Sequence, residues 1–145
     1  MFLMKTFKLK IFCSDKIFYN DQCSSLIIPT PDGEIGILAG HENMVVAIAA
    51  GEMHIKPASD ETPDKWYTAA VSPGFAEVTD NVVSVIVDTA ERPEDIDIKR
   101  AEEAKERAEE KLRQQQSIRE FYSSQASLAR AMSRLKTSRD KDWTI

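Results

Sequence analysis

The chain has 145 residues, of which 42% are hydrophobic and 30% are charged, and its formal net charge is −5. This length fits one full domain with a small appendage, and the composition is typical of a globular protein. The acidic balance argues against a nucleic-acid binder, because phosphate recognition needs a positive patch, and no apolar run long enough to predict a transmembrane helix or a signal peptide is present.

Short apolar segments separated by turn residues fill the first 90 residues. Phe7, Leu9 and Ile11 alternate with lysines, and this period of two predicts a half-buried strand. Tight turns are expected at Asp32-Gly33 and Asp80-Asn81. The expected strands cover residues 5–12, 26–28, 35–38, 44–48, 53–56, 66–71, 75–79 and 82–87. This pattern predicts an antiparallel β-sandwich or flattened barrel of about eight to ten strands.

Two cysteines, Cys13 and Cys23, lie in segments expected to be strands. Two buried thiols in a reducing compartment are the simpler interpretation, and a disulfide or redox pair is the alternative.

A helical domain is expected after a boundary at residues 90–93. The fold class is therefore α+β, with a sandwich over residues 1–90 and a two-helix hairpin over residues 91–145. Asp95 or Asp97 can cap the first helix, which carries a narrow stripe of Ala101, Ala104, Ala108 and Leu112. Because residues 94–145 contain no Gly or Pro, one continuous long helix is also compatible with the sequence.

The second helix is expected to start with a capping box at Ser117–Glu120. Its apolar side is predicted from residues at helical spacing, namely Ile118, Tyr122, Gln125, Ala129 and Met132, with Phe121, Leu128 and Leu135 beside them.

Charge is distributed unevenly along the chain. Residues 1–90 carry six basic and twelve acidic side chains, residues 91–112 six and nine, and residues 113–145 seven and three, so the net charges are −6, −3 and +4. The stripe of Arg119, Arg130 and Arg134 on the second helix is either a solvated face or a docking face for acidic loops. Asp97, Arg100 and Arg107 share one sector of the first helix, where they form either a simple ion pair or an anion site.

The motifs of common enzymes are missing from the sequence. It has no Gly-rich phosphate loop, no paired Cys motifs and no His-Glu-x-x-His. His41 lies in a loop beside Glu42, where a surface hydrogen bond explains it better than catalysis. We therefore expect no catalytic residues, no metal site and no enzymatic activity of the chain alone.

Several stretches resemble the epsilon subunit of F-type ATP synthases, in order along essentially the whole chain. They are Asp32-Gly33-Glu34-Ile35-Gly36-Ile37-Leu38 with Gly40-His41, Gly74-Phe75-Ala76-Glu77-Val78 with Asn81-Val82-Val83, and Val87-Asp88-Thr89-Ala90-Glu91 leading into Ile96-Asp97-Ile98-Lys99-Arg100-Ala101. The chain differs from the family's frequent pattern at Pro73-Gly74 and at Glu42-Asn43, which changes loop geometry rather than the fold.

The resemblance implies a subunit of the rotor stalk with no enzymatic activity of its own. Its expected partners are the gamma subunit, the ring of c subunits and the beta subunits. It would lie peripherally on the cytoplasmic face of the cell membrane, attached only through the complex, and help to couple proton or sodium flow to ATP synthesis. The C-terminal helices of bacterial members can extend along gamma and inhibit ATP hydrolysis. The alternative is a sandwich adaptor whose helical tail binds a partner constitutively.

The resemblance also implies candidate binding residues. Asp32, Gly33, Glu34 and the nearby His41 would contact the c-ring, and Arg119, Arg130 and Arg134 would contact the beta subunits. No resident cofactor is implied, but some members bind regulatory ATP, and the residues that match here are Glu91, Ile96, Asp97, Arg100, Ala101, Arg107, Arg130 and Arg134. On a helical wheel, Arg130 and Arg134 face away from the predicted apolar side, so they would reach a shared pocket only with a different packing.

Overall fold

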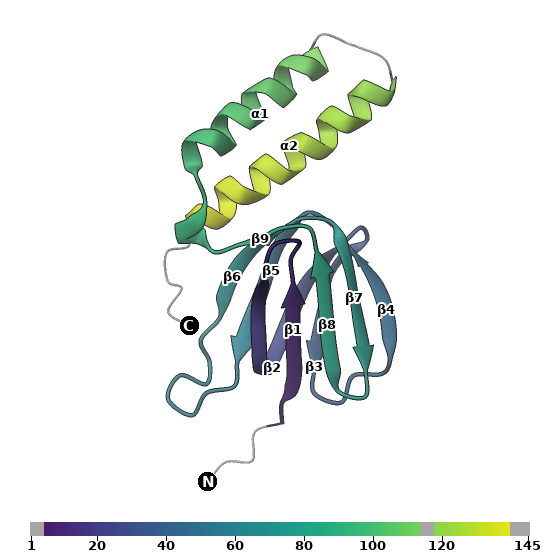
Figure 1. Ribbon diagram of the computed structural model, residues 1–145, viewed down its shortest axis with the longest axis vertical. Helices are drawn as coiled ribbons and strands as arrows, with labels where there is room; N and C mark the ends of the chain where they lie inside the picture. Colours follow the sequence, from purple (N-terminus) through teal and green to yellow (C-terminus); the bar gives the residue numbers. More distant parts are fainter. Residues whose placement is uncertain (1–4, 114–117, 140–145) are drawn as a thin grey trace.

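A computed structural model describes residues 5–113 and 118–139 as a β-sandwich with a helical hairpin at one end (Figure 1). The strands are β1 Phe7–Phe12, β2 Ile17–Thr30, β3 Gly33–Leu38, β4 Met44–Ile48, β5 Gly51–Pro57, β6 Tyr67–Val71, β7 Gly74–Thr79, β8 Val82–Val87 and β9 Ala90–Glu91. A 3-10 turn, η1 (Pro93–Asp95), leads to helices α1 (Ile98–Arg113) and α2 (Ile118–Ser138). The expected α+β class is confirmed, and β9 carries the sheet one residue past the expected boundary.

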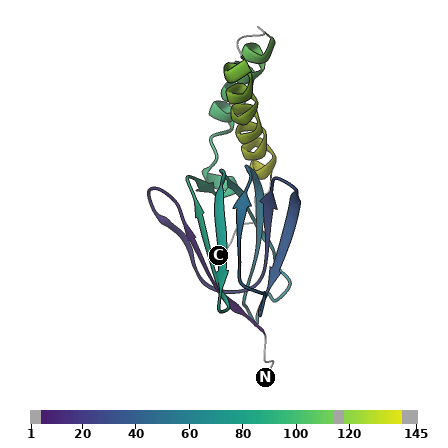
Figure 2. The same ribbon diagram turned by 90° about the vertical axis from the view of Figure 1, so that its right-hand side faces the viewer.

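The strands form one continuous sheet in the order β4-β7-β8-β1-β2-β5-β6-β9, with β3 paired to β2. The sheet folds over itself as two layers (Figure 2). β2 joins them, because its first half pairs with β1 and its second half pairs with β3 and β5. All pairs are antiparallel except β1 with β8, which are parallel. The antiparallel expectation therefore fails at this one pair.

The core lies between the layers and contains the inward side chains of both. Phe7, Leu9 and Ile11 are buried from β1, as their alternation predicted, and Met53 and Ile55 are buried from β5. The chain contributes two free thiols, with Cys23 buried and Cys13 half-buried, which agrees with the simpler interpretation.

The first half of β2 lies outside the residue ranges expected to be strands, although Cys23 within it was expected to lie in a strand-like segment. Residues 17–25 are rich in polar side chains, and only Tyr19, Cys23 and Ser25 in this stretch are buried. The turn between β7 and β8 does match, since Asp80 and Asn81 both have positive φ values, 49° and 64°. Two left-handed residues make the tight hairpin turn that suits the twist of the strands.

Helix α1 begins at an N-cap supplied by Asp97. The Asp97 Oδ1 atom accepts the Arg100 backbone N–H at 3.1 Å, and the Asp97 carbonyl accepts the Ala101 N–H. Ala101 and Ala108 are buried against α2, so the alanine stripe packs closely, as expected. The two helices form a hairpin and not one continuous helix (Figure 1).

The predicted apolar side of α2 is wrong at four positions of its main stripe, whereas Leu128 and Leu135, expected beside that stripe, are half-buried. Tyr122 is 63% exposed and Met132 51% exposed, and Gln125 and Ala129 are exposed as well. The side chains that α2 buries are small or polar, namely Ser124, Ala131, Thr137 and Ser138. A close approach to the alanines of α1 favours small residues over large apolar ones. The predicted capping residue Ser117 and the side chains of Ile118 and Phe121 lie outside the described residues.

The hairpin contacts the sandwich mainly through α2, which packs against β5, β6 and η1. The far end of the hairpin extends away from the sheet (Figures 1 and 2). In the described part of the chain, neither helix is both long and apolar enough to cross a bilayer.

Candidate anion-binding cleft

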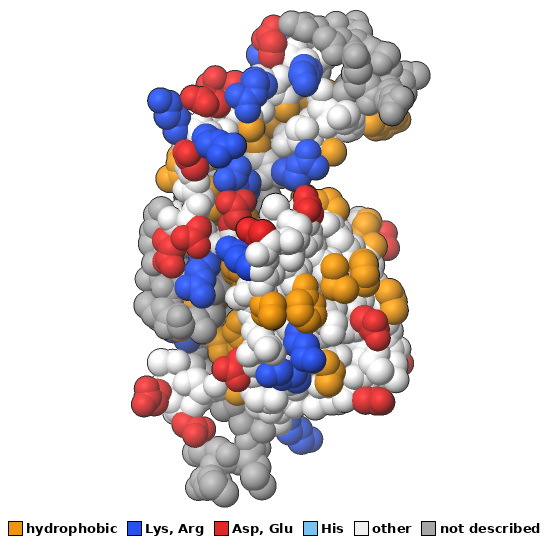
Figure 3. Space-filling view, viewed as in Figure 1, with side chains coloured by type: hydrophobic (Ala, Val, Ile, Leu, Met, Phe, Trp, Pro, Cys, Tyr) orange, Lys and Arg blue, Asp and Glu red, His pale blue; other side chains and the backbone are white. Residues whose placement is uncertain are grey.

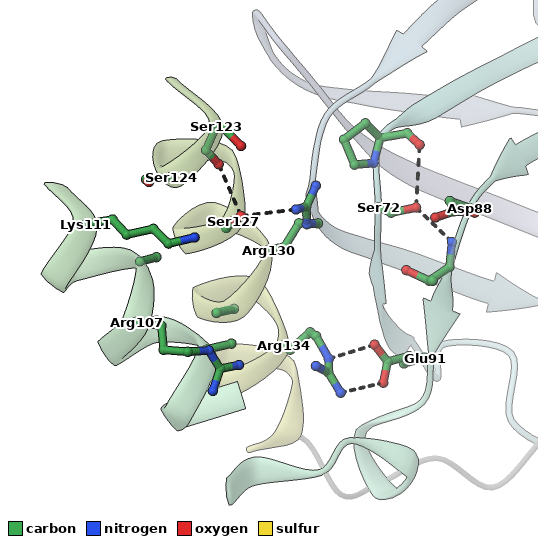
Figure 4. Close-up of a pocket in the computed structure, with 15 residues that line it drawn as sticks. Ser72, Asp88, Glu91, Arg107, Lys111, Ser123, Ser124, Ser127, Arg130 and Arg134 are labelled. Atoms are coloured by element: carbon green, nitrogen blue, oxygen red, sulfur yellow. Dashed lines mark hydrogen bonds and ion pairs between the residues drawn. The ribbon is translucent and has the colours of Figure 1, made fainter. Parts of the chain in front are cut away.

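A cleft of about 740 Å³ lies between the helical hairpin and one end of the sandwich. The sandwich contributes the loops after β6 and β8 and strand β9, and the hairpin contributes facing side chains of α1 and α2 (Figure 4). The lining residues are Ser72, Pro73, Asp88, Thr89, Glu91, Ala104, Arg107, Ala108, Lys111, Ser123, Ser124, Ser127, Arg130, Ala131 and Arg134. Small residues on both helices leave the space, and long cations border it.

Four cations line the cleft and outnumber its two carboxylates. Arg107 and Lys111 stand one turn apart on α1, and Arg130 and Arg134 stand one turn apart on α2. In Figure 4, Arg107 extends toward Arg134 and Lys111 extends toward Ser127. This arrangement concentrates positive charge where the two helices and the sandwich meet.

Arg134 is the cation that already has an ionic partner. Its Nε lies 2.7 Å from Glu91 Oε1, and its Nη2 donates to Glu91 Oε2 at 3.1 Å. The Nη2 contact is a charge-assisted hydrogen bond, and the closer Nε approach adds an ionic contact without hydrogen-bond geometry. The pair joins α2 to β9 across the base of the cleft.

The other three cations have no such partner. Within the described residues, no carboxylate lies within 4.0 Å of the charged atoms of Arg107, Lys111 or Arg130. Arg130 donates to the Ser127 hydroxyl at 3.3 Å, and that hydroxyl donates to the Ser123 carbonyl at 3.1 Å. Three cations without a counter-ion in one cleft attract an anion, and guanidinium groups suit phosphate and carboxylate ligands.

The sandwich side of the cleft is held in place by backbone contacts. The Ser72 hydroxyl accepts the Thr89 N–H at 2.8 Å, and the Ser72 N–H donates to the Thr89 carbonyl at 3.0 Å. These bonds join the loops after β6 and β8, so the sandwich presents a fixed rim toward Arg130 (Figure 4).

The structure divides the eight residues expected to bind nucleotide into two groups. Glu91, Arg107, Arg130 and Arg134 line the cleft. The remaining four do not line it: Ile96 and Ala101 are buried, Arg100 is exposed, and Asp97 caps α1.

Arg130 and Arg134 reach a shared cleft through the different helix packing that their positions on the helical wheel required for this. The simple packing depended on the misassigned apolar side of α2, and with Ser124 and Ala131 facing α1 both arginines turn toward the cleft. Sequence reasoning also missed Lys111, Asp88 and the serines of the cleft. Lys111 follows Arg107 by four residues, a spacing that places both on one helix face.

The residues expected to contact a c-ring do not form one cluster. Asp32, Gly33 and Glu34 lie at the turn that begins β3, whereas His41 follows the other end of that six-residue strand. His41 Nδ1 lies 2.8 Å from the Glu42 carbonyl, and Gly40 donates its N–H to Asn81 at 2.8 Å, beside the β7–β8 turn. A strand of this length separates its ends by roughly 17 Å. His41 is therefore not near the turn at Asp32, because the length of β3 separates them.

Two further expectations concern Arg119 and metal binding. Arg119 belongs to α2, but its side chain is outside the described part of the structure. Among the described residues, no group of three or more His, Cys, Asp or Glu side chains is arranged to hold a metal ion.

Known proteins similar to the chain cover both of its domains. Residues 6–93 match the family described as "ATP synthase, Delta/Epsilon chain, beta-sandwich domain", and residues 94–139 match the "long alpha-helix domain" of the same chain. An ATP synthase epsilon chain of Ruminiclostridium cellulolyticum is 40% identical, with 93% of this chain and 97% of that protein covered. One of Caldicellulosiruptor saccharolyticus is 42% identical, with 92% and 93% covered.

A solved structure extends this similarity to the arrangement of the chain in space. A chain in the cryo-EM structure of the Euglena gracilis mitochondrial ATP synthase, OSCP/F1/c-ring, aligns with a TM-score of 0.77 at 26% identity. The alignment covers 94% of this chain and 82% of that chain.

Proposed function

Since the chain belongs to the delta/epsilon family of ATP synthase subunits, as an F-type epsilon chain, we propose that its hairpin inhibits ATP hydrolysis when it leaves the sandwich, and that an anion in the cleft opposes this movement. The anion proposed is ATP. The subunit itself performs no catalysis and acts through the gamma, c and beta subunits of the complex, on the cytoplasmic face of the membrane.

The observation that carries the proposal is the way in which the hairpin is attached. It contacts the sandwich mainly through the C-terminal part of α2, and its far end extends away from the sheet. Elements that make few contacts with the rest of a molecule detach at low free-energy cost. A detached hairpin would also uncover the basic side chains that the docked state holds in the cleft.

Arg130 and Arg134 support an inhibitory contact with acidic loops of the beta subunits. In the docked hairpin Arg134 is paired with Glu91, and Arg130 faces the sandwich rim. Undocking would free both for other carboxylates. Each charge-assisted hydrogen bond to a partner contributes about 1.5–3 kcal/mol.

Two substitutions should change hydrolysis by the assembled enzyme in opposite directions. At ATP concentrations that leave the cleft empty, Arg130→Ala removes only a basic contact with the beta subunits and leaves the pair between Arg134 and Glu91 intact, so the hydrolysis rate should rise. Glu91→Gln weakens that pair and keeps every basic residue, so undocking and inhibition should increase. Equal rates in wild type and both variants, with the subunit assembled, would contradict the inhibitory role.

ATP is the proposed ligand because the cleft combines unpaired cations with space between small residues. Arginine and lysine side chains suit the phosphates, and the alanines of both helices leave room for a flat base. A ligand that touches both hairpin and rim favours the docked state by as much as its affinity differs between the two states.

Calorimetric titration of the full chain with ATP tests this site. Arg107→Ala and Arg130→Ala should each weaken binding by more than about tenfold, the loss expected for one charge-assisted contact. Arg113→Ala is the matched control, because Arg113 lies on the same helix outside the cleft, is paired with Glu110, and has a largely exposed side chain. Arg100→Ala distinguishes the matched motif from the cleft, since only a ligand held at the start of α1 would lose affinity with it.

Partner contacts are proposed for two other surfaces. An exposed apolar patch of Val45, Phe75 and Ile86 covers the outer face of β4, β7 and β8 (Figure 3), and we assign it to the gamma subunit. The turn at Asp32 is assigned to the c-ring. A cysteine at Asp32 should crosslink to a c-subunit loop, and a cysteine at His41, beyond the other end of β3, should not.

A further inference from the structure

The C-terminal turn of α2 is attached to the sandwich by a charged contact that is separate from the cleft. The Lys136 Nζ atom lies 2.8 Å from Glu52 Oε1, and the Thr137 hydroxyl donates to Glu52 Oε2 at 3.4 Å. Glu52 belongs to β5 and pairs with Ala70 of β6, the two strands on which α2 rests. None of the three residues lines the cleft.

The burial of this contact is unequal. The Glu52 side chain is 14% exposed and Thr137 is fully buried, whereas the Lys136 side chain is 74% exposed. Docking of α2 therefore removes a carboxylate from water but leaves its cation in water. A buried carboxylate is costly unless a cation and hydrogen bonds compensate it. Within the described residues, the ionic and hydrogen-bond partners of this carboxylate both belong to α2.

The direction of α2 makes the Glu52 carboxylate depend still more on a neighbouring cation. α2 ends at Ser138, so its C-terminal carbonyl end, which carries partial negative charge, faces the Glu52 side of the sheet. The negative charge of Glu52 and the carbonyl end of α2 repel each other, so Glu52 opposes docking unless a cation lies between them. The hydrogen bond to Glu52 raises the pKa of Lys136, with the charges of Glu52 and Glu34 adding to the effect. Lys136 is the basic residue of the last turn.

We infer that Glu52, Lys136 and Thr137 form a docking lock that sets the fraction of molecules with a docked hairpin, whether or not the cleft holds an anion. The two charged contacts that attach α2 to the sandwich then differ in whether a ligand in the cleft affects them. The pair between Arg134 and Glu91 borders the cleft, where a bound phosphate competes for Arg134. The docking lock lies outside the cleft lining, so such a ligand does not compete for its residues. The inference relies on the proposed function only for its effect on hydrolysis.

The test measures docking directly in the isolated full chain. Spin labels at Glu77→Cys on the sandwich and Glu103→Cys on α1, in a Cys13→Ser background, report the distance between hairpin and sheet by pulsed electron resonance. Glu52→Lys and Lys136→Glu should each raise the ratio of undocked to docked molecules by about tenfold, the effect of one charge-assisted hydrogen bond. The double exchange Glu52→Lys with Lys136→Glu should return the ratio toward that of the wild type.

The control exchanges the charges of a pair that does not touch the sheet. Lys105 and Glu109 form a partly exposed i,i+4 pair on α1 at 3.9 Å, so Lys105→Glu and Glu109→Lys should leave the docked fraction unchanged. If the charge reversals lower the melting temperature of the sandwich itself, Glu52→Gln and Lys136→Gln provide the same comparison with a smaller perturbation. Single variants that dock like the wild type, or a double exchange no better than the sum of its singles, would overturn the lock.

Repeating the distance measurement with saturating ATP separates this inference from the proposed function. If ATP changes the ratio of undocked to docked molecules by the same factor in wild type and lock variants, the two attachments act independently, as inferred. If the lock variants undock but hydrolysis by the assembled enzyme does not fall, the lock stands and the inhibitory role of the hairpin fails.

Discussion

Asp97 shows how one residue can satisfy two interpretations of a motif. Its place in Ile96-Asp97-Ile98-Lys99-Arg100-Ala101 resembles a nucleotide-binding pattern, but in the structure its carboxylate caps α1. Ile96 and Ala101 have packing roles of the same kind, since both are buried. Spacing alone could not separate these roles, because capping and ligand binding use the same carboxylate.

Substitution of Asp97 should therefore act first on helix stability. Asp97→Ala should lower the free energy of unfolding of the hairpin by about 1 kcal/mol, the usual loss for an N-cap. Asp97→Ser keeps a capping oxygen and should restore most of it. Hydrogen exchange of the first turn of α1 measures the effect. A loss of ATP affinity in Asp97→Ser, with the helix intact, would show instead that the carboxylate contacts ligand.

Cys23 makes the stability of the sandwich sensitive to alkaline pH. Burial raises the pKa of its thiol from 9.0 to about 11, which outweighs a smaller opposing effect of the backbone at Ser25 and Lys56. Because the folded state favours the protonated thiol, the stabilisation is complete below pH 9 and is lost as the pH rises toward 11.

The free energy of unfolding should accordingly fall between pH 9 and pH 10, and fall less in Cys23→Ala. Denaturant titrations at several pH values measure this slope. Cys13→Ser is the comparison: burial also raises the pKa of the half-buried Cys13 thiol, and the slope should respond more to the loss of the fully buried Cys23. Tyr19, whose pKa burial also raises, contributes at higher pH and is unchanged in both variants.

Among the elements, strands were easier to predict from the sequence than helix faces. The alternation of Phe7, Leu9 and Ile11 and the turn at Asp80-Asn81 are local patterns, and both match the structure. The first half of β2 was not among the predicted strand ranges because its polar and apolar residues show little alternation. The buried face of α2 was predicted wrongly because the buried residues Ser124 and Ala131 are small. A prediction from hydrophobicity selects the larger Tyr122 and Met132, which are exposed.

The cleft, too, could be predicted from the sequence only in part. Its arginines could be named from the sequence by resemblance, but their convergence depends on how α2 rotates against α1, which no local pattern specifies. Lys111 and the sandwich loops needed the assembled fold. The separation of Asp32 from His41 also became visible only when β3 was seen to lie between them.

Close packing between the helices should be sensitive to side-chain size. Ala131 is buried, whereas Ala129 on the same helix is exposed. Ala131→Leu should destabilise the hairpin by about 1–3 kcal/mol, because a larger side chain forces the helices apart. Ala129→Leu should have little effect. Hydrogen exchange across α2 measures both, and equal protection in the two variants would contradict the assigned face.

At the scale of the whole molecule, the boundary between the domains decides where the chain can be cut. β9 pairs with β6 through Ala90 and Glu91, and Ala90 is buried. A truncation after Thr89 would therefore remove part of the sheet, and a cut after Arg92 keeps it whole.

A chain that ends at Arg92 should fold, assemble and support ATP synthesis, but it should not inhibit hydrolysis. Its melting curve and the hydrolysis rate of the assembled enzyme test this. The chain that ends at Thr89 is the comparison, and we expect it to melt at a lower temperature. If the longer truncation also fails to assemble, the hairpin is structural rather than regulatory.

The parallel pairing of β1 with β8 has a consequence for the order of events during synthesis. Residues 8–12 pair with residues 82–86, so the edge of β1 stays open until β8 has left the ribosome. At ordinary translation speeds the interval is on the order of 5–10 s. Throughout that time a growing chain offers a bare strand edge to chaperones or to its neighbours. The sheet can then close while α1 and α2 are still being made, and the hairpin emerges onto a finished surface.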